Sequence, residues 1–281
     1  MSPELGRLLL DLLGRPYRLA MGLHALDLQD WLVVTADHAA EVAEKRRLLD
    51  AGADIHRLLP EGAAAAAETA ALVEAHLATH APAVRVDAGI ADPLIRAGLA
   101  VQEDLCLLEG SPEGYRLVGA FVAFPSRWSL AEKIGRPMPA IHAPVPGLEA
   151  AIGGPVRLFF ERLQADRPVW RVNWSLTDDP LLHQPSSAFR RTATEVTAAE
   201  AGRQLWLRVE RQTLRRLPRT GLVLFTILTF VEPLASLAQD RRLALLLADR
   251  LDELPAAMLT YKNLATRLPA ITSYLRAAAA A

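Results

Sequence analysis

The sequence predicts an α+β protein, in which a five-stranded antiparallel sheet carries a helical insertion and is flanked by N- and C-terminal helices. Two observations support this fold class. Hydrophobic residues recur with helical spacing in the first hundred residues and in the last fifty, whereas the residues between them contain runs that alternate with a period of two. These strand-like runs are interrupted once, by a helical stretch that prolines break.

Helices are expected in the N-terminal region, residues 1–100, which we expect to pack on the core. Residues 39–49 and the alanine-rich residues 61–76 have helical patterns. Asp92 is a typical N-cap, and a proline follows it at the first position of a short helix over residues 93–99.

The core, residues 101–233, begins with two strands over residues 104–108 and 115–124, which a turn rich in glycine and proline joins as a hairpin. A helical insertion follows them. Ser129 and Glu132 match a capping box, which predicts a short helix at the start of this insertion. A second inserted helix has its apolar residues along one face, at Val156, Phe159, Phe160 and Leu163.

Three more strands complete the sheet, at residues 169–176, 204–210 and 222–230. The last of them is apolar on both faces and should be a buried central strand. The C-terminal region, residues 234–281, returns to helix over residues 234–251 and 255–268. It ends in a run of alanines, which we expect to be frayed.

This order of elements is that of a PAS-type domain: two strands, a helical connection over one face, and three more antiparallel strands. In such a domain the sheet curls around a pocket that the inserted helices cover. The sequence therefore predicts a PAS-like core whose ligand pocket lies between the sheet and the insertion.

Composition and charge exclude several classes of function. The chain has 31 basic and 32 acidic residues, so its net charge of −1 favours neither a nucleic acid nor an anionic membrane as partner. The longest apolar stretch, residues 221–231, is too short to span a bilayer, and the N-terminus lacks a signal-peptide pattern, so we expect a cytoplasmic protein. The only cysteine, Cys106, cannot form an internal disulfide or hold an iron–sulfur cluster alone. No Walker loop, GxGxxG, HExxH or GxSxG motif is present.

His142 is the strongest candidate for a metal ligand, because prolines on both sides restrict the backbone that carries it. Such restriction fixes where the imidazole points, as an axial ligand requires. The alternative is a structural histidine that bonds to a backbone carbonyl. His183 is the only real competitor as a ligand, because the other histidines fall in the N-terminal helical region.

Two sets of polar residues on predicted strands are candidates for the walls of the pocket. Arg171 and Asn173 share one face of a strand, where they could bind carboxylates such as porphyrin propionates, and Trp174 lies on the other face. A cross-strand pair between Arg171 or Asn173 and Glu210 or Glu232 is an equally good interpretation. Glu210 could instead hold the charge of an amine substrate or accept its proton, or it could belong to a solvated turn.

Trp128 and Lys133 could stack on a planar anionic cofactor and form an ion pair with it. The alternative is a packing tryptophan and a solvated lysine.

Several spaced motifs run in order through the chain: Phe124-Pro125-Ser126-x-Trp128, Lys133-x-Gly135, Ile141-His142-x-Pro144-Val145-Pro146, Arg171-x-Asn173-Trp174, Glu210-Arg211-Gln212-Thr213-Leu214-x-Arg216-Leu217-Pro218 and Phe225-Thr226-Ile227. Together they resemble the haem-dependent oxidative N-demethylase alpha-subunit family, over roughly residues 15–260. The chain departs from that family at residues 35–40, where the tyrosine of an Asp-x-x-Tyr pattern is missing.

The resemblance implies a PAS-like fold that holds haem b and oxidises a small secondary amine, such as dimethylamine, to a primary amine and formaldehyde. O₂ is the oxidant, and the electrons come from NADPH through partner subunits that carry FMN and an iron–sulfur cluster. A chain with one cysteine and no dinucleotide motif agrees with an external reductase. Two alternatives are a non-enzymatic PAS-type sensor of haem or another small ligand, and a structural subunit with a vacant pocket.

The resemblance also implies roles for particular residues. His142 is carried over as the proximal ligand of the haem iron, with His183 as the runner-up. Glu210 and Arg211 are carried over as the substrate side of the site. The residues carried over as pocket or propionate contacts are Trp128, Lys133, Arg171, Asn173 and Trp174.

Overall fold

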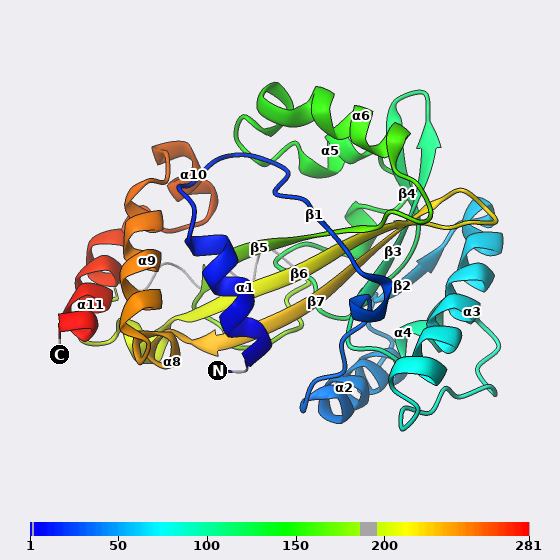
Figure 1. Ribbon diagram of the computed structural model, residues 1–281, viewed down its shortest axis with the longest axis horizontal. Coiled ribbons are helices and arrows are strands. Elements are labelled where there is room, and N and C mark those ends of the chain that lie inside the picture. The colour runs from blue at the N-terminus through cyan, green and yellow to red at the C-terminus, as the bar shows by residue number, and fades with distance from the viewer. Residues whose placement is uncertain (2, 186–195, 281) are drawn as a thin grey trace.

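The computed structural model describes residues 1, 3–185 and 196–280, and it is an α+β fold built on one antiparallel sheet. The strands have the order β1-β5-β6-β7-β3-β4-β2 across the sheet (Figure 1). Their bounds are β1 His24–Ala25, β2 His56–Leu58, β3 Asp104–Ser111, β4 Gly114–Phe121, β5 Val169–Thr177, β6 Trp206–Arg216 and β7 Val223–Pro233. The helices include α1 Pro3–Leu13, α2 His38–Asp50, α3 Ala63–His80, α4 Pro93–Gly98, α5 Met138–His142, α6 Gly154–Arg162, α9 Arg241–Asp252, α10 Ala256–Tyr261 and α11 Leu268–Ala280. Short helices α7 Ala201–Gln204 and α8 Leu234–Ala238 stand on either side of the β6–β7 hairpin.

The expectation of five strands was incomplete, because the sheet has seven. The five predicted strands are all present as β3 to β7, and the predicted central strand is β7, in the middle of the sheet. The two additional strands, β1 and β2, pair with β5 and β4 at the edges. They have only two and three residues, so no alternating pattern could predict them.

The two faces of the sheet carry different layers. We call one side the insertion face, on which Cys106, Leu214 and Phe225 pack under α5 and α6. The other side is the flank face. Its apolar residues pack against α2, α3 and α4 at one end and against α1, α9 and α11 at the other. The flank-face residues include Leu105, Leu107, Trp174, Leu207, Val209 and Leu224. The sheet is therefore covered on both sides, as Figure 1 shows.

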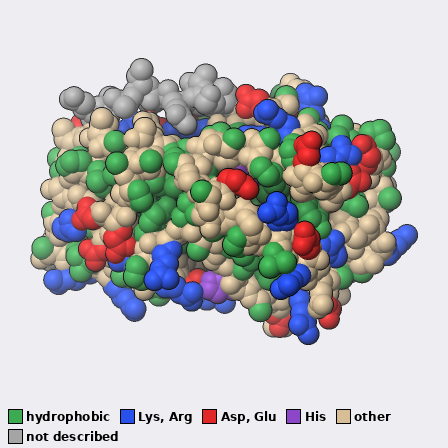
Figure 2. Space-filling view, turned by 90° about the horizontal axis from the view of Figure 1, so that it is seen from above, with side chains coloured by type: hydrophobic (Ala, Val, Ile, Leu, Met, Phe, Trp, Pro, Cys, Tyr) green, Lys and Arg blue, Asp and Glu red, His purple; other side chains and the backbone are tan. Residues whose placement is uncertain are grey.

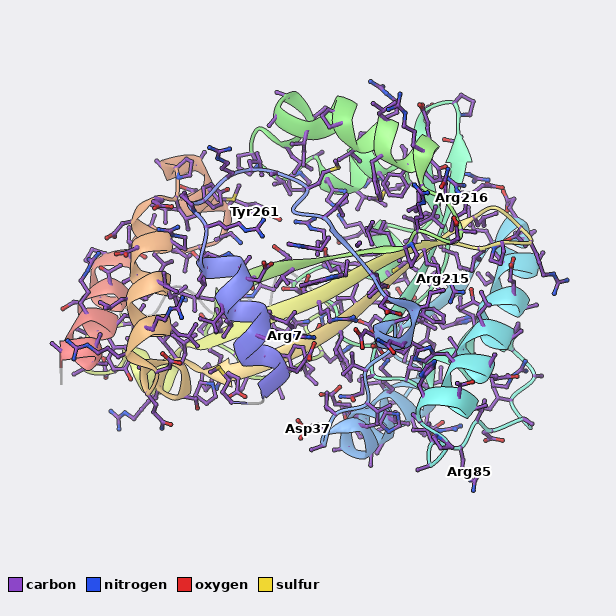
Figure 3. The ribbon with its side chains drawn as sticks, in the orientation of Figure 1. Arg7, Asp37, Arg85, Arg215, Arg216 and Tyr261 are labelled. Atoms are coloured by element: carbon purple, nitrogen blue, oxygen red, sulfur yellow. The ribbon has the colours of Figure 1, made fainter. Side chains whose placement is uncertain are left out.

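Alternation along β6 directs neighbouring arginines to these two layers. The Arg215 guanidinium lies over the ring of Trp31, 4.5 Å from its centroid, in the flank-face layer. Arg216 instead donates to the carbonyl of Leu163, 2.6 Å away, and to the Tyr115 hydroxyl, 2.9 Å away, on the insertion side. Figure 3 labels both arginines at the end of the strand.

The insertion differs from its prediction in two places. Ser129 precedes a single 3₁₀ turn and its side chain makes no capping hydrogen bond, so the expected capped helix was wrong. His142 lies at the end of a short helix, α5, which the proline-rich sequence around it did not indicate. Pro137 is the extended N-cap of this helix and Pro139 lies in its first turn, where a missing N–H costs no hydrogen bond.

The C-terminal helices also differ from their predictions. The helix expected over residues 255–268 ends at Tyr261, and Asn263 then takes a left-handed conformation with φ of 56°. The alanine tail was expected to be frayed, but it forms the end of α11, with Ala279 only 2% exposed. The absence of a side chain at Gly202 in α7 allows Tyr274 of α11 to pack closely against it, since a Cβ at Gly202 would lie 2.3 Å from the Tyr274 hydroxyl.

The surface is mixed in charge, as the net charge predicts. Figure 2 shows acidic and basic side chains interspersed with apolar ones over the face that it presents. Within residues 1, 3–185 and 196–280, no helix has the length and apolar character needed to cross a membrane.

Candidate functional site

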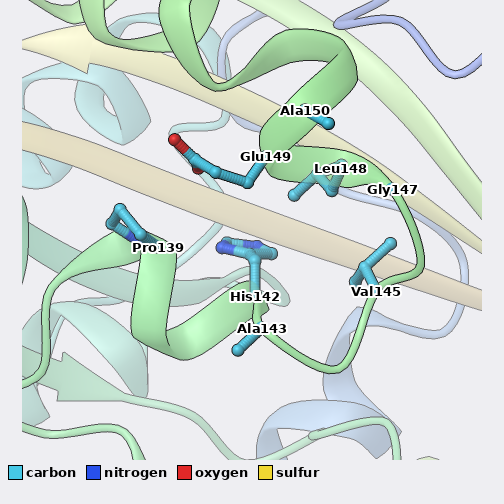
Figure 4. A pocket seen from close by; sticks show the side chains of 8 residues that line it. All are labelled: Pro139, His142, Ala143, Val145, Gly147, Leu148, Glu149 and Ala150. Carbon is cyan, nitrogen blue, oxygen red and sulfur yellow. The ribbon is translucent and has the colours of Figure 1, made fainter.

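His142 lines a surface pocket of about 180 Å³ between α5 and the π-helical turn Glu149–Gly153 that leads into α6. Figure 4 shows its ring among the other side chains of the pocket, below Leu148 and Glu149 and beside Pro139. π-helical turns are uncommon and are often found at functional sites.

The hydrogen bonding of His142 leaves one ring nitrogen available. Its Nδ1 lies 3.0 Å from the carbonyl oxygen of Met138, one helical turn earlier. Burial lowers the pKa of His142, the Met138 carbonyl opposes this, and the positive charges of Arg171 and Lys133 lower it further. The imidazole is therefore neutral at pH 7, with its proton on Nδ1 and the lone pair of Nε2 free to bind a metal.

Polar side chains on the insertion face of the sheet form a cluster around Glu210. Asn173, directly opposite on β5, donates to its carboxylate at 3.3 Å, and Gln212 donates to the same oxygen at 2.9 Å. The other carboxylate oxygen lies 3.7 Å from Nε of Arg208. The cross-strand pairing that the sequence left open is thus present for Asn173, and it holds the carboxylate in one place.

Arg171 lies two register positions from this pair, on the same face and opposite Gln212. Its Nε is buried and has no hydrogen-bond partner. Burial lowers the pKa of Arg171, and the charge of Glu210 opposes that effect. Because a buried N–H of a guanidinium without a partner is unfavourable, this position suits an anionic ligand.

Lys262, just after α10, lies beside this cluster at the edge of β5 and was missed from the sequence. Its Nζ donates to the carbonyl of Trp174 at 2.6 Å and lies 5.1 Å from the centroid of that ring. Burial lowers the pKa of Lys262 to about 8, while Glu210 raises it and Arg171 lowers it. No local pattern could connect Lys262 with β5, since 88 residues separate it from Trp174.

Two of the predicted site residues lie away from this cluster, on the flank face. Trp174 is 7% exposed and belongs to the apolar core there. Arg211 donates to the carbonyl of Trp31 at 3.1 Å and also to the carbonyl of Asp30. Alternation along β6 gives the reason, because adjacent residues such as Glu210 and Arg211 point to opposite faces.

Trp128 and Lys133 lie in the insertion, near His142. Trp128 packs against the apolar cluster under α5 and α6. Lys133 is partly buried, and its Nζ donates to the carbonyl of Ile141 at 3.0 Å, one residue before His142. Lys133 therefore helps to hold the end of α5 that carries the imidazole.

His183 lies in a different environment. Its Nδ1 is 2.6 Å from the carbonyl oxygen of Ala123, and Arg208 donates to the carbonyl of the preceding Leu182 at 3.1 Å. These contacts attach the segment after β5 to the end of β4, and His183 is absent from the pocket that His142 lines.

Glu149 is a second residue that the sequence reasoning missed. Its carboxylate folds back onto the following helical turn, so that a Cβ at Gly153 would lie 2.2 Å from one of its oxygens. Figure 4 shows this carboxylate in the wall of the His142 pocket. A glycine four residues after an acid was the only available signal, and such spacing is weak evidence.

The chemistry of these donors fits a haem better than a metal bound by side chains alone. Among the described residues, no three His, Cys, Asp or Glu side chains come together as a metal site. A haem needs only one imidazole from the protein, and the imidazole of His142, with Nδ1 bonded to a carbonyl, fits that requirement. The unpaired Nε of Arg171 fits a carboxylate of the porphyrin. The pocket of about 180 Å³ holds only part of such a ligand. All the residues that line it belong to the insertion and none to the sheet, so it is not the pocket that the sequence predicted between the sheet and the insertion.

A comparison with known families gives one match over most of this region. The family model described as haem-dependent oxidative N-demethylase, alpha subunit-like, matches residues 82–271, more than half of the chain. The matched range contains the whole sheet except β1 and β2, the insertion with His142, and the polar cluster with Arg171, Glu210 and Lys262.

Proposed function

Because the chain belongs to the haem-dependent oxidative N-demethylase, alpha subunit-like family, we propose that it removes a methyl group from a small secondary amine of the dimethylamine type. One methyl carbon is oxidised and leaves as formaldehyde, and the primary amine remains. O₂ takes up the two electrons from this carbon together with two electrons and two protons supplied from outside, and water is released.

The observation that carries this proposal is the neutral imidazole of His142, which lines a pocket and whose Nδ1 is held by the carbonyl of Met138. His142 would hold the iron of haem b from one side, and Arg171 would bind a propionate. A haem held in this way supplies the activation of O₂. Trp128 and Lys133 would support the helix and the wall on the proximal side.

Glu210 is proposed to bind the amine. A secondary amine is protonated at neutral pH, so a carboxylate fixed by Asn173 and Gln212 can hold it and later accept its proton. The methyl group is then oriented by the apolar residues of the insertion. Arg211 lies on the opposite face, and we assign it the structural role of holding the carbonyls of Asp30 and Trp31.

The alpha-subunit description implies an enzyme of several subunits. We propose that partner subunits carry FMN and an iron–sulfur cluster and pass electrons from NADPH to this chain, in the cytoplasm. We also propose that the five long strands are a PAS-like core, supported by their chain order and by the insertion that covers one face.

The test is an absorption spectrum of the protein expressed with a haem precursor. The wild type and His183→Ala should show a strong Soret band, whereas His142→Ala should lose or shift it. Formaldehyde and methylamine should then form in equal amounts from dimethylamine, O₂ and an artificial reductant.

Two outcomes would contradict the proposal. A Soret band that His142→Ala leaves unchanged would remove the proposed ligand. A haem protein whose spectrum does not respond to dimethylamine and that releases no formaldehyde would be a sensor rather than an enzyme.

A further inference from the structure

Two cations and one anion meet at the outer edge of β5, where the short pairing with β1 has ended at Trp170. Arg171 comes from β5 itself, Glu210 from β6 and Lys262 from just after α10. Glu210 bonds to Asn173, Arg171 lies two residues before Asn173 on the same face of β5, and Lys262 bonds to the carbonyl of the next residue, Trp174. The pKa directions agree with this proximity, because the charge of Glu210 raises the pKa of both cations. Figure 3 labels Tyr261, the last residue of α10 and the residue before Lys262.

The charges in this cluster are not balanced. Among the residues that the structure describes, Glu210 is the only carboxylate that acts on the pKa of Arg171 or Lys262, and its oxygens are already shared among Asn173, Gln212 and Arg208. Arg171 keeps a buried Nε without a partner. Lys262 uses one of its three N–H groups, on the Trp174 carbonyl. A cluster with surplus buried positive charge is unfavourable unless an anion completes it.

We infer that Arg171 and Lys262 form a carboxylate-binding subsite beside Glu210. Both side chains keep a small exposed part, so a ligand can reach them from the surface. The planar guanidinium provides parallel donors for a carboxylate, and the ammonium provides a second cation from another element of the fold. This inference rests on the proposed function only in naming the two ligands that can bring the carboxylate.

The first source is a haem propionate, as proposed for Arg171, with Lys262 as its second contact. The second source is the substrate. An N-methyl amino acid has a protonated secondary amine and a carboxylate on neighbouring carbons, and Glu210 next to two cations is complementary to that zwitterion. Dimethylamine, which has no carboxylate, would leave the two cations unpaired.

The experiment compares Lys262→Met with Lys262→Gln, which keeps a donor for the Trp174 carbonyl without the charge. Arg276→Met, which removes one cation from an exposed pair with Asp252, is the matched control. Each protein is titrated with haem and with haem dimethyl ester, whose propionates are neutral. The haem-loaded proteins are then titrated with N-methylglycine and with dimethylamine, followed by difference spectra. Thermal unfolding checks that each variant is folded.

Loss of a charge-assisted hydrogen bond should weaken carboxylate binding about 10- to 100-fold. If both Lys262 variants lose haem affinity but bind the dimethyl ester like the wild type, the subsite is confirmed with propionate as its ligand. If both Lys262 variants keep haem affinity and lose affinity for N-methylglycine but not for dimethylamine, the subsite is confirmed with the substrate carboxylate as its ligand. Wild-type affinities throughout, with both folded variants matching Arg276→Met, would overturn the inference.

Failure of the proposed function gives a different result. If the wild-type protein binds no haem, calorimetry with N-methylglycine and acetate tests the subsite directly. Binding that both Lys262 variants lose and Arg276→Met retains would support the subsite without any haem chemistry. Absence of binding to the wild type would overturn it.

Discussion

Among single residues, Lys262 has the clearest expected effect on how the stability of the protein depends on pH. Its pKa is lowered to about 8 from an ordinary value of 10.5, chiefly by burial. Below pH 8 the lysine is charged in both the folded and the unfolded chain, and burial makes this unfavourable for the folded one. Between pH 8 and 10.5 the unfolded chain binds more protons, so the stability contributed by this group rises with pH.

We therefore predict that the free energy of unfolding of the wild type rises relative to that of Lys262→Met, by about 2 to 3 kcal/mol between pH 7 and pH 10.5. Urea denaturation at several pH values measures this difference. The same comparison with Arg276→Met, an exposed cation, should show no such trend. A difference between wild type and Lys262→Met that stays constant with pH would contradict the prediction.

Alternation within a strand allowed part of the site to be predicted from the sequence. It correctly gave Arg171 and Asn173 one face and Trp174 the other, because side chains on a regular strand must alternate. The same rule, applied to the adjacent residues Glu210 and Arg211, places them on opposite faces of the sheet. Lys262 could not be predicted, because its contact with β5 depends on how the C-terminal helices pack and not on local spacing.

At the scale of elements, Asp178 joins three segments just after β5. Arg127 donates to one of its oxygens at 2.6 Å and Arg267, just before α11, donates to the other at 2.8 Å. These side chains are 14% and 3% exposed, and that of Asp178 is 9% exposed. Arg127 also has a left-handed backbone with φ of 62°, which is unusual for a residue other than glycine.

We predict that Asp178→Asn lowers the free energy of unfolding by about 3 kcal/mol or more, because it leaves two largely buried guanidinium groups without their anion. Arg276→Ala, which breaks an ion pair whose side chains are 47% and 44% exposed, should cost less than about 0.5 kcal/mol. Urea denaturation of the two variants tests the contrast, and similar losses for both would refute this assignment.

A second prediction for an element concerns the stability effect of a charge placed in the alanine tail. Ala279 is 2% exposed within α11, whereas Ala277 is exposed in the same helix. A charge placed at Ala279 must be buried or must displace the end of the helix, so Ala279→Glu should cost about 2 kcal/mol. Ala277→Glu should change the midpoint of thermal unfolding very little. Equal effects would mean that the tail is frayed, as its composition indicated.

The long elements were predicted well and the short ones poorly, for a physical reason. β3 to β7 have at least eight residues each, enough for an alternating pattern to be recognised. α5 was not predicted, since its five residues include a proline and span little more than one turn. Its helical form depends on Pro137 as an extended N-cap and on packing against the sheet.

For the whole molecule, the flanking helices are part of the core that stabilises the sheet. Leu107 and Leu224 pack with α2, α3 and α4, and Leu207 and Val209 pack with α1, α9 and α11. A fragment of residues 101–233 would expose this entire face to water. We predict that the fragment is unfolded or aggregated, by circular dichroism and gel filtration, while the full chain is folded and monodisperse. A soluble, cooperatively unfolding fragment would contradict this.

The arrangement of these layers could be predicted only in outline. Composition indicated a large core and terminal helices that pack on it, which agrees with the structure. Which helices cover which face could not be derived, because the apolar stripe of a helix does not specify its partner. The same limit applies to the site, whose members come from α5, β5, β6 and α10.

The lone thiol of Cys106 has a practical consequence. It is 5% exposed and lies on the insertion face under α5 and α6, and burial, followed by the charge of Asp104, raises its pKa well above the usual range. A thiol reagent can reach it only when the inserted helices lift from the strands. The rate of its alkylation therefore reports how often the insertion that carries His142 separates from the sheet.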